Sequence, residues 1–238
     1  MELEALASYL FDHINDEQPD HLVAGLINLE TWMEANYVEA NEGYRVDDLP
    51  LDVVVDLEGQ TPTSMEGQLG AAVAYEIPYP MDEVMHVNLA VSSMEVNPDQ
   101  YLEYSEEWTT DLDCFLAQEC LFAEVITETL SNFPLNLEVF TRNVNQHRWV
   151  ELPDGRMAEV RRNWMVEPGL ANVDWINIEQ QYFFAAVFPK DGVTRRVDAG
   201  WVLIELFSAP IPENLGVQIA VDSMKKNGET ITAYLDAQ

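Results

Sequence analysis

Two Asp-Gly turns in the second half of the chain constrain the fold more than any other feature of the sequence. The turns are Pro153-Asp-Gly155 and Pro189-Lys-Asp-Gly192. Glycine adopts positive φ freely, so Asp-Gly between two strand patterns strongly indicates a β-hairpin. The strand patterns that these turns join are His147–Leu152 with Arg156–Val166, and Trp175–Phe188 with Val193–Phe207. The sequence therefore predicts an antiparallel meander.

Helical spacing occurs at both ends of the chain. The C-terminal pattern, Glu213–Leu235, has apolar residues at intervals of three and four, as does the second N-terminal pattern, His21–Asn41. The remaining expected elements are helices at Glu2–Asn15 and Met81–Ala90, and strands at Gln68–Ile77, Leu121–Leu130 and Leu135–Val144. Residues 47–59 fit a strand and a helix equally well. Together these patterns predict an α+β protein.

Two parts of the chain resemble the START-like (SRPBCC, Bet v 1-like) superfamily. They are the strand Gly67–Ile77 running into Tyr79-Pro-Met-Asp-Glu-Val84, and the strand Thr194–Phe207 with the helix that follows it. The resemblance covers roughly residues 65–238 and is one of texture, because the superfamily has no invariant catalytic motif. It implies a curved antiparallel sheet gripping a long C-terminal helix, with a cavity between them. Most members bind apolar molecules such as lipids, and a minority are cyclases or hydrolases.

This reading divides the chain into two regions. Residues 1–62 are predicted to form an N-terminal helical extension, and residues 63–238 the START-like helix-grip domain. Within the second region, residues 97–120 are acidic, contain both cysteines, and are expected to be an insertion.

The charge is strongly negative and unevenly distributed. Of a net charge of −32, residues 1–141 carry −29 and residues 142–238 carry −3. Binding to phosphate backbones or anionic lipids depends on Lys and Arg, so no nucleic-acid partner is expected. A basic protein is a candidate partner. No apolar run reaches the ~18 residues of a membrane helix, so the chain is not expected to span a membrane.

The two cysteines provide information about the cellular compartment of the protein. Cys114 and Cys120 are six residues apart, which favours a small disulfide-closed loop over two free thiols. A disulfide would indicate a periplasmic or secreted protein, and without it the compartment is open. The acidic start Met1-Glu2-Leu3-Glu4 does not fit a signal peptide, while earlier removal of a leader is left open.

The strands of the meander carry apolar side chains on both faces, so both faces should be covered, one by the C-terminal helix and the other by the N-terminal helices. Large aromatic residues with a few polar groups suit an apolar ligand held at one polar end. The residues predicted to contact it are Arg162, Trp164, Gln180, Tyr182, Phe184, Trp201 and Met224. Two alternatives stay open: a solid core without a cavity, and a structural pairing of Arg162 with Glu159, Glu179 or Asp198.

No catalytic motif is present. The chain lacks G-x-S-x-G, a phosphate-binding glycine loop and H-E-x-x-H, so we expect no catalytic residue, no cofactor and no metal site. Two alternatives are a Ca²⁺ site at Asp111, Asp113 and Glu119, and an acid–base pair of His147 with Glu179.

Three functional hypotheses follow. The first is binding or carriage of a lipid-like apolar molecule between the sheet and the C-terminal helix. The second is an enzyme of the same superfamily, which requires convergence of polar residues such as Arg162, His147, Glu179 and Tyr182. The third is a non-catalytic interaction protein with an acidic face.

Overall fold

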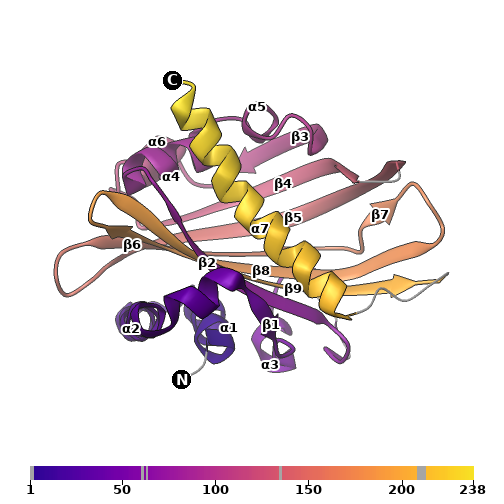
Figure 1. Cartoon of the computed structure of the whole chain (residues 1–238), viewed down its shortest axis with the longest axis horizontal. Helices are drawn as coiled ribbons and strands as arrows, with labels where there is room; N and C mark the ends of the chain where they lie inside the picture. The colour runs from indigo at the N-terminus through magenta and orange to yellow at the C-terminus, as the bar shows by residue number, and fades with distance from the viewer. Residues whose placement is uncertain (1–2, 60–61, 63, 134–135, 208–212) are drawn as a thin grey trace.

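The computed structural model describes residues 3–59, 62, 64–133, 136–207 and 213–238. Within these residues nine strands form one open antiparallel sheet of order β1-β2-β9-β8-β6-β5-β4-β3, with β7 beside β5 (Figure 1). The strands are β1 (Tyr44–Val46), β2 (Leu69–Ile77), β3 (Tyr101–Trp108), β4 (Phe122–Phe133), β5 (Leu137–Glu151), β6 (Met157–Met165), β7 (Leu170–Ala171), β8 (Ile176–Lys190) and β9 (Val193–Leu206). The helices are α1 (Leu3–His13), α2 (Asp20–Glu42), α3 (Leu51–Val54), α4 (Met81–Ala90), α5 (Ser93–Val96), α6 (Leu112–Leu116) and α7 (Glu213–Asp236).

The predicted hairpins are confirmed. Between β8 and β9, Lys190 pairs with Val193, leaving a two-residue turn. Both turn residues have positive φ, +48° for Asp191 and +85° for Gly192, as a type I′ turn requires. Between β5 and β6, the amide of Leu152 donates to the carbonyl of Arg156 at 2.8 Å. The α+β meander with a long C-terminal helix is therefore the observed fold class.

One prediction about the strands was wrong. Leu135–Val144 and His147–Leu152 were expected as separate strands, but β5 runs without a break from Leu137 to Glu151. The polar residues between the two predicted strands remain in the sheet because side chains of the neighbouring strand accept their hydrogen bonds. The Asn145 amide donates to Thr127 Oγ1 at 3.1 Å, and the Gln146 amide donates to Glu124 Oε2 at 2.8 Å.

Segment 97–120 contains regular structure that the sequence did not predict. Within it β3 pairs with β4 along the edge of the sheet, and α6 follows. A disulfide joins Cys114 to Cys120, as expected. Asp111 caps α6 by accepting the amide of Cys114 at 3.1 Å. The Trp149 indole donates to the carbonyl of Phe115 at 2.8 Å, which ties the disulfide loop to β5.

Helices cover both faces of the sheet, as the apolar alternation predicted. On one face, α1 and α2 share a core with the buried side chains of β6, β8 and β9. On the other face α7 packs mainly on β2, and Figure 1 shows it crossing the strands diagonally. The approach of α7 is close, since a Cβ on Gly228 would lie 2.4 Å from the ring of Tyr75.

The N-terminal region packs directly on the sheet. Strand β1 pairs with β2, and the apolar side chains of α1 and α2 belong to the largest buried cluster. The division of the chain at residue 62 stays a prediction. Across the described residues, no helix combines the length and the apolar character needed to cross a membrane.

Candidate ligand-binding cavity

A cavity of about 420 Å³ lies between the sheet and α7. Small-molecule sites commonly have volumes of roughly 300–1,000 Å³. Strands β3, β4, β5, β6 and β8 contribute to the lining, together with α4, α5 and the Ser223, Asn227 and Ile231 side chains of α7. The cavity is therefore where the helix-grip arrangement implies one.

The floor of this cavity is polar. Because side chains alternate along a strand, every second residue of β4 and β5 faces α7. The polar residues at these positions are Thr127, Thr129, Ser131, Thr141, Asn143, Asn145 and His147. Several are almost inaccessible, with Thr127, Thr129 and Ser131 each 8% exposed. A polar strand face normally meets water, whereas here α4, α5 and α7 cover it.

Four buried polar atoms of the lining have no hydrogen-bond partner among the described residues. Trp108 Nε1 and Arg161 Nε are donors, and Asn143 Oδ1 and Asn163 Oδ1 are acceptors. Most buried polar groups in proteins are hydrogen-bonded, and leaving one unpaired costs about 1–3 kcal/mol. Four such atoms lie around this one cavity.

One end of the cavity contains buried charged groups. His147 Nδ1 lies 2.8 Å from Glu159 Oε1, and the two side chains are 3% and 1% exposed. Burial lowers the pKa of His147 below its usual 6.5, while the bond to Glu159 acts in the opposite direction. Arg161 lies opposite His147 in the sheet, and its guanidinium is 5.4 Å from the centre of the Phe183 ring. Burial also lowers the pKa of Arg161.

A second buried ion pair supports this end of the sheet. Arg196 Nε donates to Asp198 Oδ1 at 2.7 Å, and the Tyr75 hydroxyl donates to Asp198 Oδ2 at 2.8 Å. Arg161 and Glu159 interact with this pair through space. Two guanidinium groups and two carboxylates thus balance one another.

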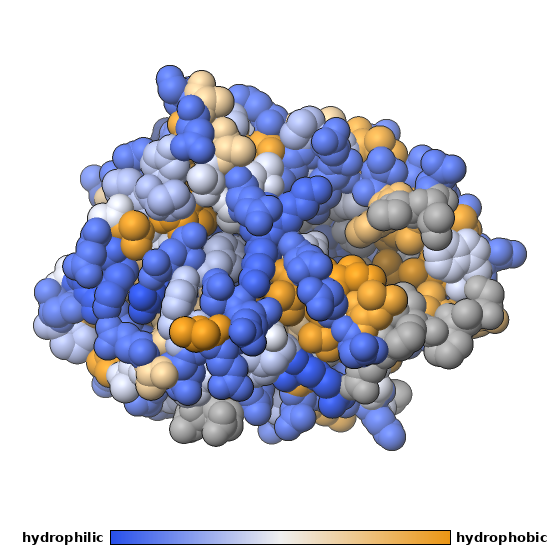
Figure 2. Space-filling model, in the orientation of Figure 1, coloured by the Kyte–Doolittle hydropathy of each residue, from blue (hydrophilic) through white to orange (hydrophobic). Residues whose placement is uncertain are grey.

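The other end of the cavity contains apolar side chains. Phe133, Val139 and Ile178 line it. In the β4–β5 ladder Ser131 pairs with Val139, while His147 pairs with Ala123 near the opposite end of β4. Figure 2 shows apolar surface beside the first turns of α7, where the exposed side chains of Leu215 and Ile219 lie outside the cavity lining. The cavity therefore has charged groups at its His147 end, while its Phe133 end combines these apolar side chains with the hydroxyl of Ser131.

Seven residues were predicted to contact a ligand, and all seven lie in the part of the chain that the structure describes. None of them lines this cavity. Trp164, Tyr182, Phe184 and Trp201 lie on the face that packs against α1 and α2. The indole N–H groups of Trp164 and Trp201 donate to backbone carbonyls of Glu58 and Asp47 at 2.9 Å. The predicted alternation was correct, but the aromatic-rich face is a packed core.

The other three predicted residues also have partners outside the cavity. Arg162 donates to Gln146 Oε1 at 2.9 Å and to the carbonyl of Phe11, near the C-terminus of α1, at 2.8 Å. The prediction that Arg162 pairs with Glu159, Glu179 or Asp198 was therefore wrong. Burial lowers the pKa of Arg162 to about 10. Gln180 accepts a hydrogen bond from Gln68, and Met224 packs in the core between α7 and the sheet.

The enzyme hypothesis required four polar residues to converge. Of these, His147 faces the cavity, and Arg162 and Tyr182 lie on the opposite face of the sheet. The fourth, Glu179, accepts a hydrogen bond from Asn177 and is not among the lining residues. Sequence reasoning did not identify Trp108, Arg161 or Asn163 as lining residues. The pattern that could have identified this site is the run of Thr, Ser and Asn at every second position of β4 and β5.

Fold and cavity define a helix-grip α+β protein with an amphipathic internal site. No protein-family model matches the chain, and no curated protein sequence matches it. A START superfamily protein from Mycobacterium smegmatis is similar in structure, with a TM-score of 0.43 and 8% identity over 71% of this chain and 97% of that chain. The STAR-related lipid transfer protein (fragment 25–204) from Xanthomonas axonopodis has a TM-score of 0.43 and 12% sequence identity, and the match covers 74% of this chain and 98% of that chain. Ara h 8.0201 has a TM-score of 0.38 and 11% sequence identity, and the match covers 72% of this chain and 100% of that chain.

Proposed function

We propose that this protein binds and carries a small amphiphilic molecule in the cavity between its sheet and α7, without chemical conversion. The observation that carries the proposal is the group of four buried, unpartnered polar atoms on Trp108, Asn143, Arg161 and Asn163. A ligand end group that both donates and accepts hydrogen bonds would satisfy them. The apolar body of the ligand would lie along Phe133, Val139 and Ile178.

The charge balance favours an uncharged end group. Arg161 and Arg196 are offset by Glu159 and Asp198, so the site offers hydrogen bonds without a net charge. Burying an additional unpaired charge is costly, whereas a primary amide or a hydroxyl supplies donors and acceptors without that cost. A neutral fatty amide or alcohol therefore fits better than a fatty acid.

Calorimetric titration with decanamide, decanoate and decane tests this proposal. Decanamide should bind most tightly, since decane leaves the four polar atoms unpaired and decanoate adds a charge. Asn163→Leu should weaken decanamide binding at least tenfold. Asn177→Leu is the matched control, because Asn177 lies in β8 outside the cavity lining and its loss should leave the affinity unchanged.

Extraction of the purified protein gives an independent test. Native mass spectrometry should show a bound mass that organic solvent removes and that is absent from the Asn163→Leu variant. A protein that releases no molecule and binds none of the three probes would contradict the proposal.

The disulfide supports an extracytoplasmic location for this binding. Disulfides persist in oxidising compartments, and Cys114–Cys120 closes a loop that is tied to β5 through Phe115. Thiol labelling of acid-quenched cells, without reduction, should leave both cysteines unmodified. Labelling of both would argue for a reducing compartment.

A further inference from the structure

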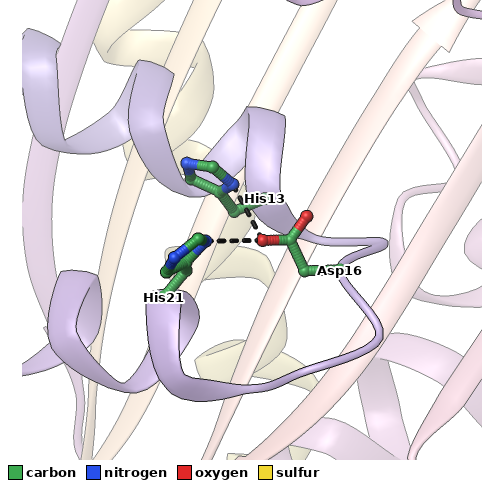
Figure 3. A group of neighbouring side chains, drawn as sticks. All are labelled: His13, Asp16 and His21. Carbon is green, nitrogen blue, oxygen red and sulfur yellow. Dashed lines mark hydrogen bonds and ion pairs between the residues drawn. The ribbon is translucent and has the colours of Figure 1, made fainter.

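The turn between α1 and α2 brings two histidines and an aspartate together. His13 is the last residue of α1, Asp16 lies in the turn, and His21 is the second residue of α2. Asp16 Oδ2 lies 2.9 Å from His13 Nδ1 and 2.8 Å from His21 Nδ1. Figure 3 shows both rings directing a nitrogen at this one oxygen, and the three ligand atoms lie within 4.8 Å of one another.

We propose that His13, Asp16 and His21 form a binding site for a divalent transition metal of the Zn²⁺ type. Two imidazole nitrogens and one carboxylate oxygen are ligands that zinc, cobalt, nickel and copper accept, whereas magnesium and calcium prefer oxygen alone. Three protein ligands leave one tetrahedral position for water.

Metal binding requires an adjustment of all three ligand atoms, which lie within 4.8 Å of one another. With zinc–ligand bonds of about 2.0–2.2 Å, tetrahedral ligand atoms lie roughly 3.3 Å apart. The 2.8 and 2.9 Å separations are hydrogen-bond distances and would widen by about half an ångström. A neutral histidine moves its proton from Nδ1 to Nε2 when Nδ1 binds the metal.

The surrounding structure holds these ligands in place. Arg148 Nη1 donates to the carbonyls of Ile14 and Asp16, at 2.7 and 2.6 Å, and so fixes the backbone of the turn. The Tyr9 ring packs edge-on against His13, with the ring centres 4.2 Å apart. A site preorganised by neighbouring contacts loses less entropy on binding.

The site is also accessible and favourably charged. The side chains of His13, Asp16 and His21 are 23%, 34% and 59% exposed, so an ion can reach them without unfolding. The net charge of −32 attracts cations to the surface. A bound ion would link the end of α1 to the start of α2, and so brace the helical pair that covers the aromatic core.

Titration of the full chain with Co²⁺ and Zn²⁺ tests the site. Co²⁺ should bind one per chain with visible absorption bands of a four-coordinate ion, and Zn²⁺ should displace it. His13→Gln, Asp16→Asn and His21→Gln should each weaken binding at least tenfold and abolish the rise in thermal midpoint that Zn²⁺ gives the parent protein. His86→Gln is the matched control, since His86 is an exposed histidine of α4 outside the cluster.

Three outcomes would overturn the proposal. The first is no Co²⁺ spectrum at millimolar metal. The second is binding that all three substitutions leave intact. The third is equal competition by Mg²⁺, which would indicate diffuse attraction to the acidic surface. Circular dichroism of His21→Gln, which alters the most exposed of the three residues, shows whether a loss of binding reflects a lost ligand or a lost fold.

Discussion

At the scale of single residues, the ion pair of Arg196 and Asp198 is almost completely buried in the sheet. Asp198 is fully buried and holds both the Arg196 guanidinium and the Tyr75 hydroxyl. Asp198→Asn removes the charge and leaves a buried arginine unpaired, so the free energy of unfolding should fall by about 3–5 kcal/mol. Urea denaturation measures this loss.

The comparison for that variant is a more exposed ion pair, which joins β2 to β9. Glu76 on β2 bonds Arg195 on β9 at 2.6 Å, but the Glu76 side chain is 37% exposed. Glu76→Gln should cost less than about 1 kcal/mol, as exposed pairs do. Equal losses for the two variants would show that burial does not govern the strength of these pairs.

His147 should make the stability of the protein depend on pH. Burial holds its folded-state pKa below 6.5, so the unfolded chain binds the proton first as the pH falls. The free energy of unfolding should then decrease below pH 6.5 by up to about 1.4 kcal/mol per pH unit. In His147→Gln this component should be absent, so urea midpoints between about pH 7 and pH 5 should change less. Parallel pH profiles would contradict this assignment.

At the scale of elements, α7 approaches β2 closely at Gly228. Gly228→Ala places a methyl group against the Tyr75 ring, 2.4 Å away, and should destabilise the protein by about 1–3 kcal/mol although alanine favours helix by about 1 kcal/mol. Gly216→Ala in the same helix meets only the mobile end of Leu69, at 2.8 Å. It should be neutral or slightly stabilising. Thermal unfolding of the two variants separates packing from helix propensity.

The disulfide loop makes a local contribution to stability. Cys114 and Cys120 are six residues apart, and closing so short a loop removes about 2 kcal/mol of chain entropy from the unfolded state. Replacing both with serine should lower the free energy of unfolding by that amount. Reduction of the parent protein is the control and should reproduce the loss. A much larger effect would mean that the loop also supports the Trp149 contact with the sheet.

Element patterns predicted most of the fold and little of the cavity. Turn chemistry at Gly155 and Gly192 and the alternation of β6, β8 and β9 correctly gave the meander and the two covered faces. Sequence alternation does not say which helix covers which face, so the aromatic face was mistaken for the pocket wall. His13 and His21 could not be paired from sequence, because only the angle between α1 and α2 brings their rings together.

At the scale of the whole molecule, charge repulsion should limit stability at low salt. A net charge of −32 on 238 residues opposes compaction, and the repulsion is screened when the Debye length falls from ~30 Å at 0.01 M salt to ~3 Å at 1 M. The thermal midpoint should therefore rise with NaCl. An uncharged osmolyte at the same osmolality is the control. A midpoint that falls with salt would mean that attractive ion pairs outweigh the repulsion.

Strand β5 contributes residues to both proposed sites, one on each of its faces. Gln146 and Arg148 hold the turn that contains Asp16, while His147 between them lines the cavity. An ion at the turn and a molecule in the cavity would thus act on three consecutive residues of a single strand. If the ion changes the affinity for the molecule by some factor, the molecule must change the affinity for the ion by the same factor, because binding free energies are linked reciprocally. The proposed metal site and the proposed ligand cavity are thus separated by the thickness of one strand.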